Sequence, residues 1–168
     1  MKKILLILSA IAVIAANIGC DQASKQYARK HFKGKPVISF AGDTIDIVYA
    51  ENSGGFLSLG SRMKQPLKNS IMIIIPIAAI FLALVFIFFS KHLSNLELFL
   101  LCSVAGGGIS NIYDRITHKG LVTDFLNVGI GPIRTGIFNL ADMAILFGLI
   151  LLVLIQMGKK PENAAHET

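Results

Sequence analysis

Two aspartates in this chain combine a chemically capable residue type with an unusual setting. Asp124 follows one long apolar segment, in Leu-Val-Thr-Asp-Phe-Leu, and Asp142 lies inside the next apolar segment. An ionisable side chain within a membrane-spanning segment costs about 2.5–3.5 kcal/mol on insertion scales, so such a residue is a candidate for function. Two carboxylates brought together can share one proton and activate a water molecule, as in aspartic proteases. The pair therefore predicts hydrolysis beside a membrane.

The composition is that of a small integral membrane protein. Of the 168 residues, 54% are hydrophobic and 15% are charged, whereas a soluble domain carries about 25% charged residues. The formal net charge is +6. Nucleic acid is a poor partner for this positive charge, because most of the chain is expected to lie in lipid. Anionic membrane lipids are the better partner.

Four apolar segments approach the roughly 20 residues that a membrane-spanning helix needs. They predict an all-α membrane protein, a four-transmembrane-helix bundle with helices over about residues 4–20, 69–90, 96–114 and 137–157. Residues 1–168 are expected to form a single integral membrane domain. With four spans, both termini lie on one side of the membrane.

Two charge arguments point to opposite orientations of the bundle in the membrane. Lys2 and Lys3 before the first segment favour a cytoplasmic N-terminus, whereas a count of Lys and Arg over all loops favours the opposite orientation. The first helix usually dominates, so we expect both termini to be cytoplasmic. Asp124 in a loop and Asp142 just inside a span then place the site near the outer face.

The segments between the apolar runs are expected to lie outside the membrane. Residues 21–68 predict a small outer unit with two strands, 37–40 and 44–49, around Ala41-Gly42-Asp43. The second outer loop, about residues 117–136, is rich in glycine and carries Asp124. Residues 158–168 form a polar C-terminal tail, which is expected to be disordered.

The N-terminal segment can also be interpreted as a lipoprotein signal. Two lysines, an apolar run and Ile18-Gly19-Cys20 imitate a signal whose cysteine is acylated. Three further apolar spans follow, which a secreted lipoprotein would not have. We therefore favour a first membrane helix over a cleaved signal.

Four sequence blocks carry a resemblance to a known family. They are Asp21-Gln22-Ala23-Ser24-Lys25, Asn52-Ser53-Gly54-Gly55-Phe56, Gly106–Arg115 with Asp124-Phe125 following, and Phe138-Asn139-Leu140-Ala141-Asp142. In this order and between these spans, the blocks resemble lipoprotein signal peptidase, also called signal peptidase II. Ser110 and Gly55 depart from the usual family pattern by small-for-small changes, and neither aspartate is altered.

The resemblance implies a specific activity. Such enzymes are aspartic endopeptidases that cut diacylglyceryl-modified prolipoproteins on the N-terminal side of the lipid-bearing cysteine. The family's catalytic dyad falls on Asp124 and Asp142. Members of the family are located in the bacterial cytoplasmic membrane and are the target of globomycin-type inhibitors. We expect a monomer that needs no cofactor and no metal.

Ten further residues are expected to bind substrate or to support the site. They are Asp21, Lys25, Asn52, Gly54, Gly107, Asn111, Asp114, Arg115, Asn139 and Ala141. Gly107, Asn111 and Asp114 fall on one stripe of the third helix, and such a polar stripe should face the bundle interior. Asn139 and Asp142 share a face of the fourth helix.

Each of these residues also has a plainer interpretation. Asp142 is also explained as a helix-terminal carboxylate and Asp124 as a solvated loop residue. Asn139 fits a helix N-cap, and the glycines around Gly107 fit close helix packing. The remaining plain interpretations are a surface ion pair for Asp21 and Lys25, and a turn residue for Asn52.

Two other classes of function remain open at this point. A small transporter or proton-relay protein would use Asp142 and Asp114 and would not need Asp124. A structural membrane subunit would leave Asp124, Asn52 and Asp21 without roles. Joint dependence on both aspartates separates the dyad from these alternatives.

Overall fold

The fold is known from a computed structural model that describes residues 2–54, 67–90 and 93–159. Part of the predicted outer unit, including Gly55 and Phe56, lies outside the described residues, as does the predicted tail from residue 160 onward. The elements, in chain order, are α1 (Lys2–His31), β1 (Ile38–Phe40), β2 (Ile45–Asn52), α2 (Leu67–Phe89), α3 (Asn95–Thr117), β3 (Val122–Ile130), β4 (Ile133–Arg134) and α4 (Leu140–Gly158).

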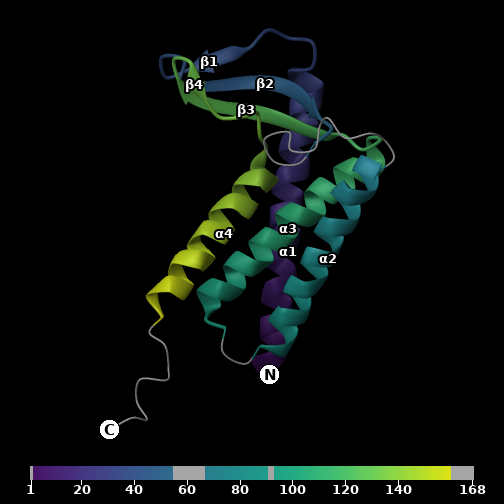
Figure 1. The fold of residues 1–168 in the computed structure, drawn as a ribbon, viewed down its shortest axis with the longest axis vertical. Helices are drawn as coiled ribbons and strands as arrows, with labels where there is room; N and C mark the ends of the chain where they lie inside the picture. Colours follow the sequence, from purple (N-terminus) through teal and green to yellow (C-terminus); the bar gives the residue numbers. More distant parts are fainter. Residues whose placement is uncertain (1, 55–66, 91–92, 160–168) are drawn as a thin grey trace.

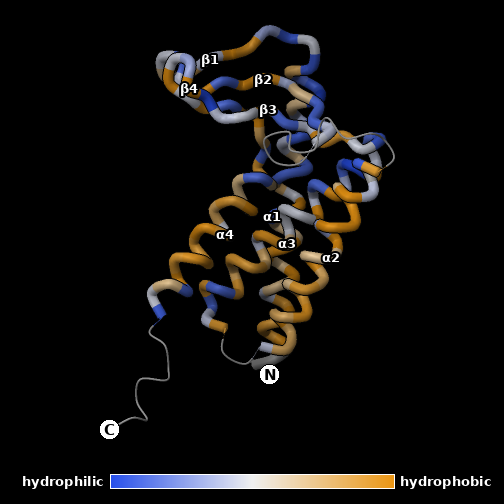
Figure 2. Tube along the Cα trace, viewed as in Figure 1, coloured by the Kyte–Doolittle hydropathy of each residue, from blue (hydrophilic) through white to orange (hydrophobic). Residues whose placement is uncertain are grey.

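Four helices within the described residues are long and apolar enough to cross a membrane. They form a bundle with a small sheet at one end, and the N-terminus lies at the opposite end (Figure 1). Apolar residues dominate the helices, whereas many polar residues lie in the sheet and where the helices meet it (Figure 2). The predicted fold class, a four-helix membrane bundle with a small β-containing unit, is confirmed.

Helix α1 is much longer than its apolar segment. The prediction ended it near residue 20, but the helix continues to His31. Asp21 and Lys25 therefore lie on α1 and not in the outer loop. The prediction was wrong because a membrane helix was expected to end with its apolar run, whereas the polar continuation of α1 packs against α3 and β3.

Helix α3 is the centre of the bundle, since it packs against each of the other three helices. It begins with a capping box in which the Ser94 side chain accepts from the Glu97 backbone N–H and Glu97 accepts from the Ser94 backbone N–H. Glu97 also accepts from Gln156 at 2.9 Å and from Lys159 at 2.7 Å. These contacts join the start of α3 to the end of α4, far from the sheet.

The sheet is antiparallel, with strand order β1-β2-β3-β4. Its first two strands were predicted, but β3 and β4 lie in the segment that was expected to be a glycine-rich loop. Because β3 pairs with β2, the two predicted outer loops form one sheet. Asp124 therefore lies on a paired strand, and its position is fixed by the sheet.

The two faces of the sheet differ in polarity near its free end. Ser39 donates to Asp46 at 2.8 Å, and Arg134 donates to both Asp46 and Asn127, on one face. Cross-strand partners on the other face are apolar, with Phe40 opposite Ile45 and Ile45 opposite Val128. An amphipathic sheet of this kind suits a position between water and another surface.

Candidate active site

Asp124 lies on β3 directly opposite Ala50 of β2, where the register of the two strands shifts. Such irregularities are common beside active sites because they re-aim a side chain. The carboxylate is 1% exposed. Asn52 donates to its Oδ2 at 2.9 Å and Asn139 donates to its Oδ1 at 2.6 Å. The backbone N–H of Gly54 donates to Asn52 Oδ1 at 2.8 Å, which fixes the orientation of that amide.

Asp142 lies in the first turn of α4, and Asn139 is the N-cap of this helix. The Asn139 side chain accepts from the Asp142 backbone N–H at 2.9 Å, and the Asn139 N–H donates to Asp142 Oδ2 at 3.3 Å. Asn111 of α3 donates to the other oxygen, Oδ1, at 2.9 Å. The N-cap interpretation of Asn139 is thus confirmed, and the same side chain also contacts Asp124.

Both aspartates line one cavity of about 330 Å³. Its other polar residues are Asn52, Asn111 and Arg115, and the remainder of its wall is apolar or lacks a side chain: Met72, Pro76, Gly108, Ile112, Val122, Ile145, Leu146 and Leu149. Three helices and the start of β3 contribute to this wall. A peptide bond and an apolar chain could both be accommodated in such a cavity.

The environment of Asp124 favours its protonated form. Burial, and secondarily the carboxylate of Asp142, raise the pKa of Asp124 to about 6, although hydrogen bonds from Asn52 and Asn139 act in the opposite direction. A carboxyl group that titrates near neutral pH can hold or release a proton under working conditions. Within the described residues, no group of three or more His, Cys, Asp or Glu could hold a metal ion.

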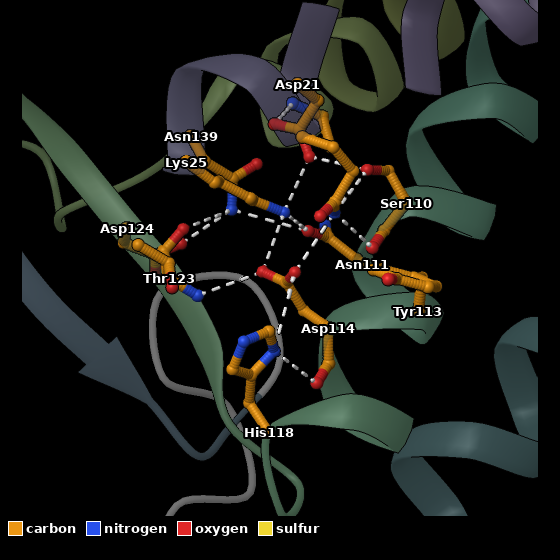
Figure 3. A network of polar contacts seen from close by, with 12 residues as sticks. Asp21, Lys25, Ser110, Asn111, Tyr113, Asp114, His118, Thr123, Asp124 and Asn139 are labelled. Carbon is orange, nitrogen blue, oxygen red and sulfur yellow. Dashed lines mark hydrogen bonds and ion pairs between the residues drawn. The ribbon is translucent and has the colours of Figure 1, made fainter. Parts of the chain in front are cut away.

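Lys25 lies at the centre of a polar network that also includes Asp124 and Asn139 (Figure 3). Its side chain is 0% exposed and its Nζ lies 2.7 Å from Asp21 Oδ2, 3.3 Å from Asp114 Oδ2 and 2.7 Å from Asn111 Oδ1. The interpretation of Asp21 and Lys25 as a surface ion pair is therefore wrong. The pair is buried because the continuation of α1 packs on α3, and it orients the amide of Asn111 toward Asp142.

Both carboxylates around Lys25 are also satisfied by other donors. Asp21 accepts from the Ser110 hydroxyl at 2.7 Å and from the Ala141 backbone N–H at 2.9 Å. Asp114 accepts from Gln22 at 3.0 Å. These bonds link α1, α3 and the first turn of α4, so they hold together the elements that carry the site.

A further set of contacts joins this network to β3. The Thr123 backbone N–H donates to Asp114 Oδ2 at 3.2 Å. Arg29 donates to the Thr123 hydroxyl at 2.9 Å, and its guanidinium lies 3.7 Å from Asp114. Since Thr123 directly precedes Asp124, these contacts fix the strand at the point where the carboxylate emerges.

Arg115 joins the segment that follows β2 to the segment that precedes β3. Its guanidinium is buried, donating to the Gly120 carbonyl at 3.0 Å and also to the Gly54 carbonyl. Arg115 therefore holds the segment that follows Asn52 against the end of α3. Gly54, predicted as a site residue, contributes backbone atoms to this contact.

Gly107 lets α3 approach the start of α4 closely. A Cβ atom at this position would lie 2.7 Å from the Ala141 carbonyl oxygen and 3.1 Å from a side-chain carbon of Ile145. Ala141 is itself 1% exposed. Close approach at this point brings Asn111 within hydrogen-bonding distance of Asp142, so the packing role predicted for the glycine serves the site.

Four residues of the network were not predicted as site residues: Gln22, Arg29, Ser110 and Thr123. Ser110 lies four residues before Asp114, on the predicted polar stripe of α3, so helix periodicity could have identified it. Gln22 and Arg29 depend on the length of α1. Thr123 depends on the pairing of β3, which leaves no clear signal in the local sequence.

The fold of this chain is shared by solved bacterial membrane enzymes. Two solved structures of bacterial membrane enzymes superpose with TM-scores of 0.77 and 0.76, at 20% and 19% sequence identity. They cover 92% and 93% of this chain, and the chain covers 96% and 94% of theirs. At such low identity, the likeness concerns the fold alone.

Sequence comparison identifies the family. The profile described as signal peptidase (SPase) II matches residues 13–157. The lipoprotein signal peptidase of Borrelia duttonii is 35% identical over 162 residues, which cover 94% of each chain. That of Caldicellulosiruptor bescii is 34% identical over 151 residues, covering 90% of this chain and 92% of the relative. The chain belongs to the signal peptidase II family of peptidases, which confirms the resemblance.

Proposed function

We propose that this protein removes signal peptides from diacylglyceryl-modified prolipoproteins, cutting on the N-terminal side of the lipid-bearing cysteine. Membership of the signal peptidase II family and the names of its relatives support this activity. The main structural support is Asn139, which donates to Asp124 while capping the helix turn that carries Asp142. This arrangement brings two carboxylates from different elements to one cavity.

The proposed mechanism uses the two aspartates as one pair with one shared proton. The ionised member takes a proton from a water molecule, whose oxygen attacks the scissile carbonyl carbon. The protonated member donates its proton to the carbonyl oxygen, giving a tetrahedral intermediate. The aspartate that took the proton from water then donates it to the nitrogen as the C–N bond breaks, while the other aspartate accepts a proton from a hydroxyl of the intermediate as the carbonyl forms again. The pair titrates as a unit, so neither role is assigned to one residue.

The charges of the buried network favour a pair that holds one proton. Four carboxylates, those of Asp21, Asp114, Asp124 and Asp142, lie among the cations Lys25, Arg29 and Arg115. One proton on the pair leaves three negative charges against three positive charges. An uncompensated charge in a buried site is costly, so the surrounding network supports the protonation state that the mechanism needs.

The cavity also suits a substrate that arrives from the bilayer. Most of its wall is contributed by apolar residues of α2, α3 and α4, which are helices apolar enough to span the membrane. We propose a site near the outer face of the bacterial cytoplasmic membrane, with both termini cytoplasmic. A monomer that interacts with anionic lipids and is inhibited by globomycin-type compounds is the accompanying hypothesis.

The test is cleavage of a diacylglyceryl-modified prolipoprotein by the purified protein. Wild type is expected to release the signal peptide, whereas Asp124→Asn and Asp142→Asn fold but lose activity. Asp43→Asn is a matched control, because Asp43 is an exposed residue of the β1–β2 turn. Its backbone is left-handed, and asparagine tolerates that conformation well. Full activity in either dyad variant, or an inert wild type, would exclude the proposed mechanism and leave the transporter as the next hypothesis.

A further inference from the structure

A second polar cleft adjoins the network around Lys25 through Arg29 and Thr123, outside the cavity that holds the two aspartates. Its volume is about 400 Å³, and its polar lining includes Arg29, Lys33, Glu51, His118, Lys119 and Thr123. These residues come from the end of α1 and the segment after it, from the segment after α3, and from the facing strands β2 and β3. None of them lines the cavity in which the proposed hydrolysis takes place.

The lining of the cleft carries one positive charge more than the neighbouring carboxylates balance, because Arg29 already faces Asp114. Lys33 pairs with Glu51 at 2.8 Å, so these two charges offset each other. Lys119 is exposed and makes no ion pair within the part of the chain that the structure describes.

Arg29 is the most confined cation of the cleft. Its side chain is 24% exposed, and Nη1 donates to the Thr123 hydroxyl at 2.9 Å. Asp114 lies 3.7 Å away, beyond hydrogen-bond distance, and already accepts from Gln22 and pairs with Lys25. The remaining N–H groups of the guanidinium are therefore suited to an anion, and its planar fork matches phosphate.

The depth of the cleft matches the head groups of a bilayer. A hydrocarbon core of about 30 Å takes up about 20 helical residues, which, counted from Ile4, end near Ser24. Arg29 lies roughly 7 Å further along the axis of α1, within the polar layer that borders the core. His118 lies at the same end of the bundle, directly after α3 and beside Asp114 (Figure 3).

We propose that this cleft binds the phosphate group of an anionic phospholipid, held by Arg29 and Lys119 with His118 beside them. The occupant is specified by three observations: the unpaired charge of Lys119, guanidinium N–H groups of Arg29 that make no hydrogen bond within the described residues, and a position at head-group depth. A bound phosphate would stabilise β3 through Arg29, which donates to Thr123. The binding site stands independently of the proposed peptidase activity, because no residue of the aspartate pair contributes to it.

The experiment counts the lipids that the full-length protein retains. The protein is exchanged into detergent with equal amounts of phosphatidylglycerol and phosphatidylcholine of identical acyl chains, and bound lipid is measured by native mass spectrometry. Wild type is expected to retain one phosphatidylglycerol. Each charge near the surface contributes about 1 kcal/mol to anionic lipid binding, which is roughly fivefold in affinity. Arg29→Gln and Lys119→Gln should each weaken retention by at least that factor.

Matched variants distinguish this site from general attraction to a basic surface. Lys30→Gln and Lys35→Gln remove the same charge from exposed positions that do not line the cleft, and they should retain the lipid as wild type does. Arg29→Lys should recover part of the binding that Arg29→Gln loses. If Arg29→Gln fails to fold, Lys119→Gln alone decides the outcome, because its side chain is exposed.

Three results would overturn the proposal. The first is absence of preferential phosphatidylglycerol binding by wild type. The second is an equal loss of binding in the cleft and control variants, which would indicate diffuse electrostatic attraction. The third is equally tight binding of inorganic phosphate alone, which would identify a free anion and not a lipid head group as the ligand.

Discussion

Replacement of Lys25 by methionine is the sharpest test of the buried network. Methionine has a similar volume and an unbranched chain, so the variant removes the charge and the hydrogen bonds with little change in packing. Lys25 is 0% exposed and its Nζ faces Asp21, Asp114 and Asn111. The variant would leave two buried carboxylates with one fewer counter-charge.

The expected magnitude follows from this burial. Breaking a buried ion pair by removing one partner costs about 3–5 kcal/mol, because the other charge is left uncompensated. For a chain of 168 residues, this loss corresponds to a decrease in apparent Tm on the order of 10 °C. Loss of Lys25 also removes a charge that lowers the pKa of Asp124, so that pKa should rise further.

The assay is thermal unfolding of the purified protein in detergent, together with prolipoprotein cleavage across pH. Lys30→Met is the matched control, because Lys30 is exposed on the same helix, and its Tm should stay close to that of wild type. The double variant Lys25→Met/Asp21→Asn restores the charge balance and should be more stable than Lys25→Met alone. The asparagine introduced at position 21 can still accept a hydrogen bond from the Ala141 N–H.

Two outcomes would refute this reasoning. If Lys25→Met unfolds at the same temperature as Lys30→Met, the lysine does not compensate buried charge. If the double variant is no more stable than Lys25→Met, the loss of stability arises from packing and not from charge. In either case the charges around the aspartates would not explain a pair that holds one proton.

Three further predictions concern other parts of the molecule. The kcat/KM of wild type should fall as pH rises through about 6, the pKa of Asp124, because the pair then loses the proton it shares. Asn52→Leu removes an amide whose hydrogen bond stabilises the carboxylate. This variant should therefore move the fall in kcat/KM to higher pH in the pH–rate profile. Gly107→Ala places a methyl group against a backbone carbonyl of α4 and should lower both Tm and kcat, at a cost of about 1–3 kcal/mol, whereas Gly108→Ala meets the end of a flexible side chain and should be tolerated better. Glu97→Ala removes the capping box of α3 far from the aspartates and should lower Tm while leaving kcat of the folded protein unchanged; a decrease in kcat equal to that of Gly107→Ala would contradict this separation.

The helices were predictable because the hydrocarbon core of the membrane requires a simple, local sequence pattern. A spanning helix needs a long apolar run, and each of α1 to α4 contains one. The end of α1 was not predictable in this way, because its continuation is polar and is stabilised by burial against α3. The residues Asp21 and Lys25 were identified through the family blocks, but their burial required the packed structure.

The sheet was predictable only in its first half. Val37–Phe40 and Thr44–Tyr49 flank the turn residues Ala41-Gly42-Asp43, and Thr44–Ile47 alternate in polarity, a local pattern that indicates a hairpin. Strand β3 is stabilised by pairing with β2, a partner far away in the sequence. Long-range pairing of this kind leaves a weak local signal, so Asp124 could be assigned to the site but not to a strand.

The carboxylate pair depends on Asn139 more than its sequence position suggests. As an N-cap it fixes the first turn of α4, which sets the direction of Asp142, and its amide donates to Asp124 at 2.6 Å. One side chain therefore positions both aspartates. The interpretations of Asn139 as a helix cap and as a contact of the dyad are both correct, because the same amide does both. Aspartate at this position could still cap the helix, but it would place a third carboxylate where Asp124 now receives a donor. The choice of asparagine is explained by the pair and not by the helix alone.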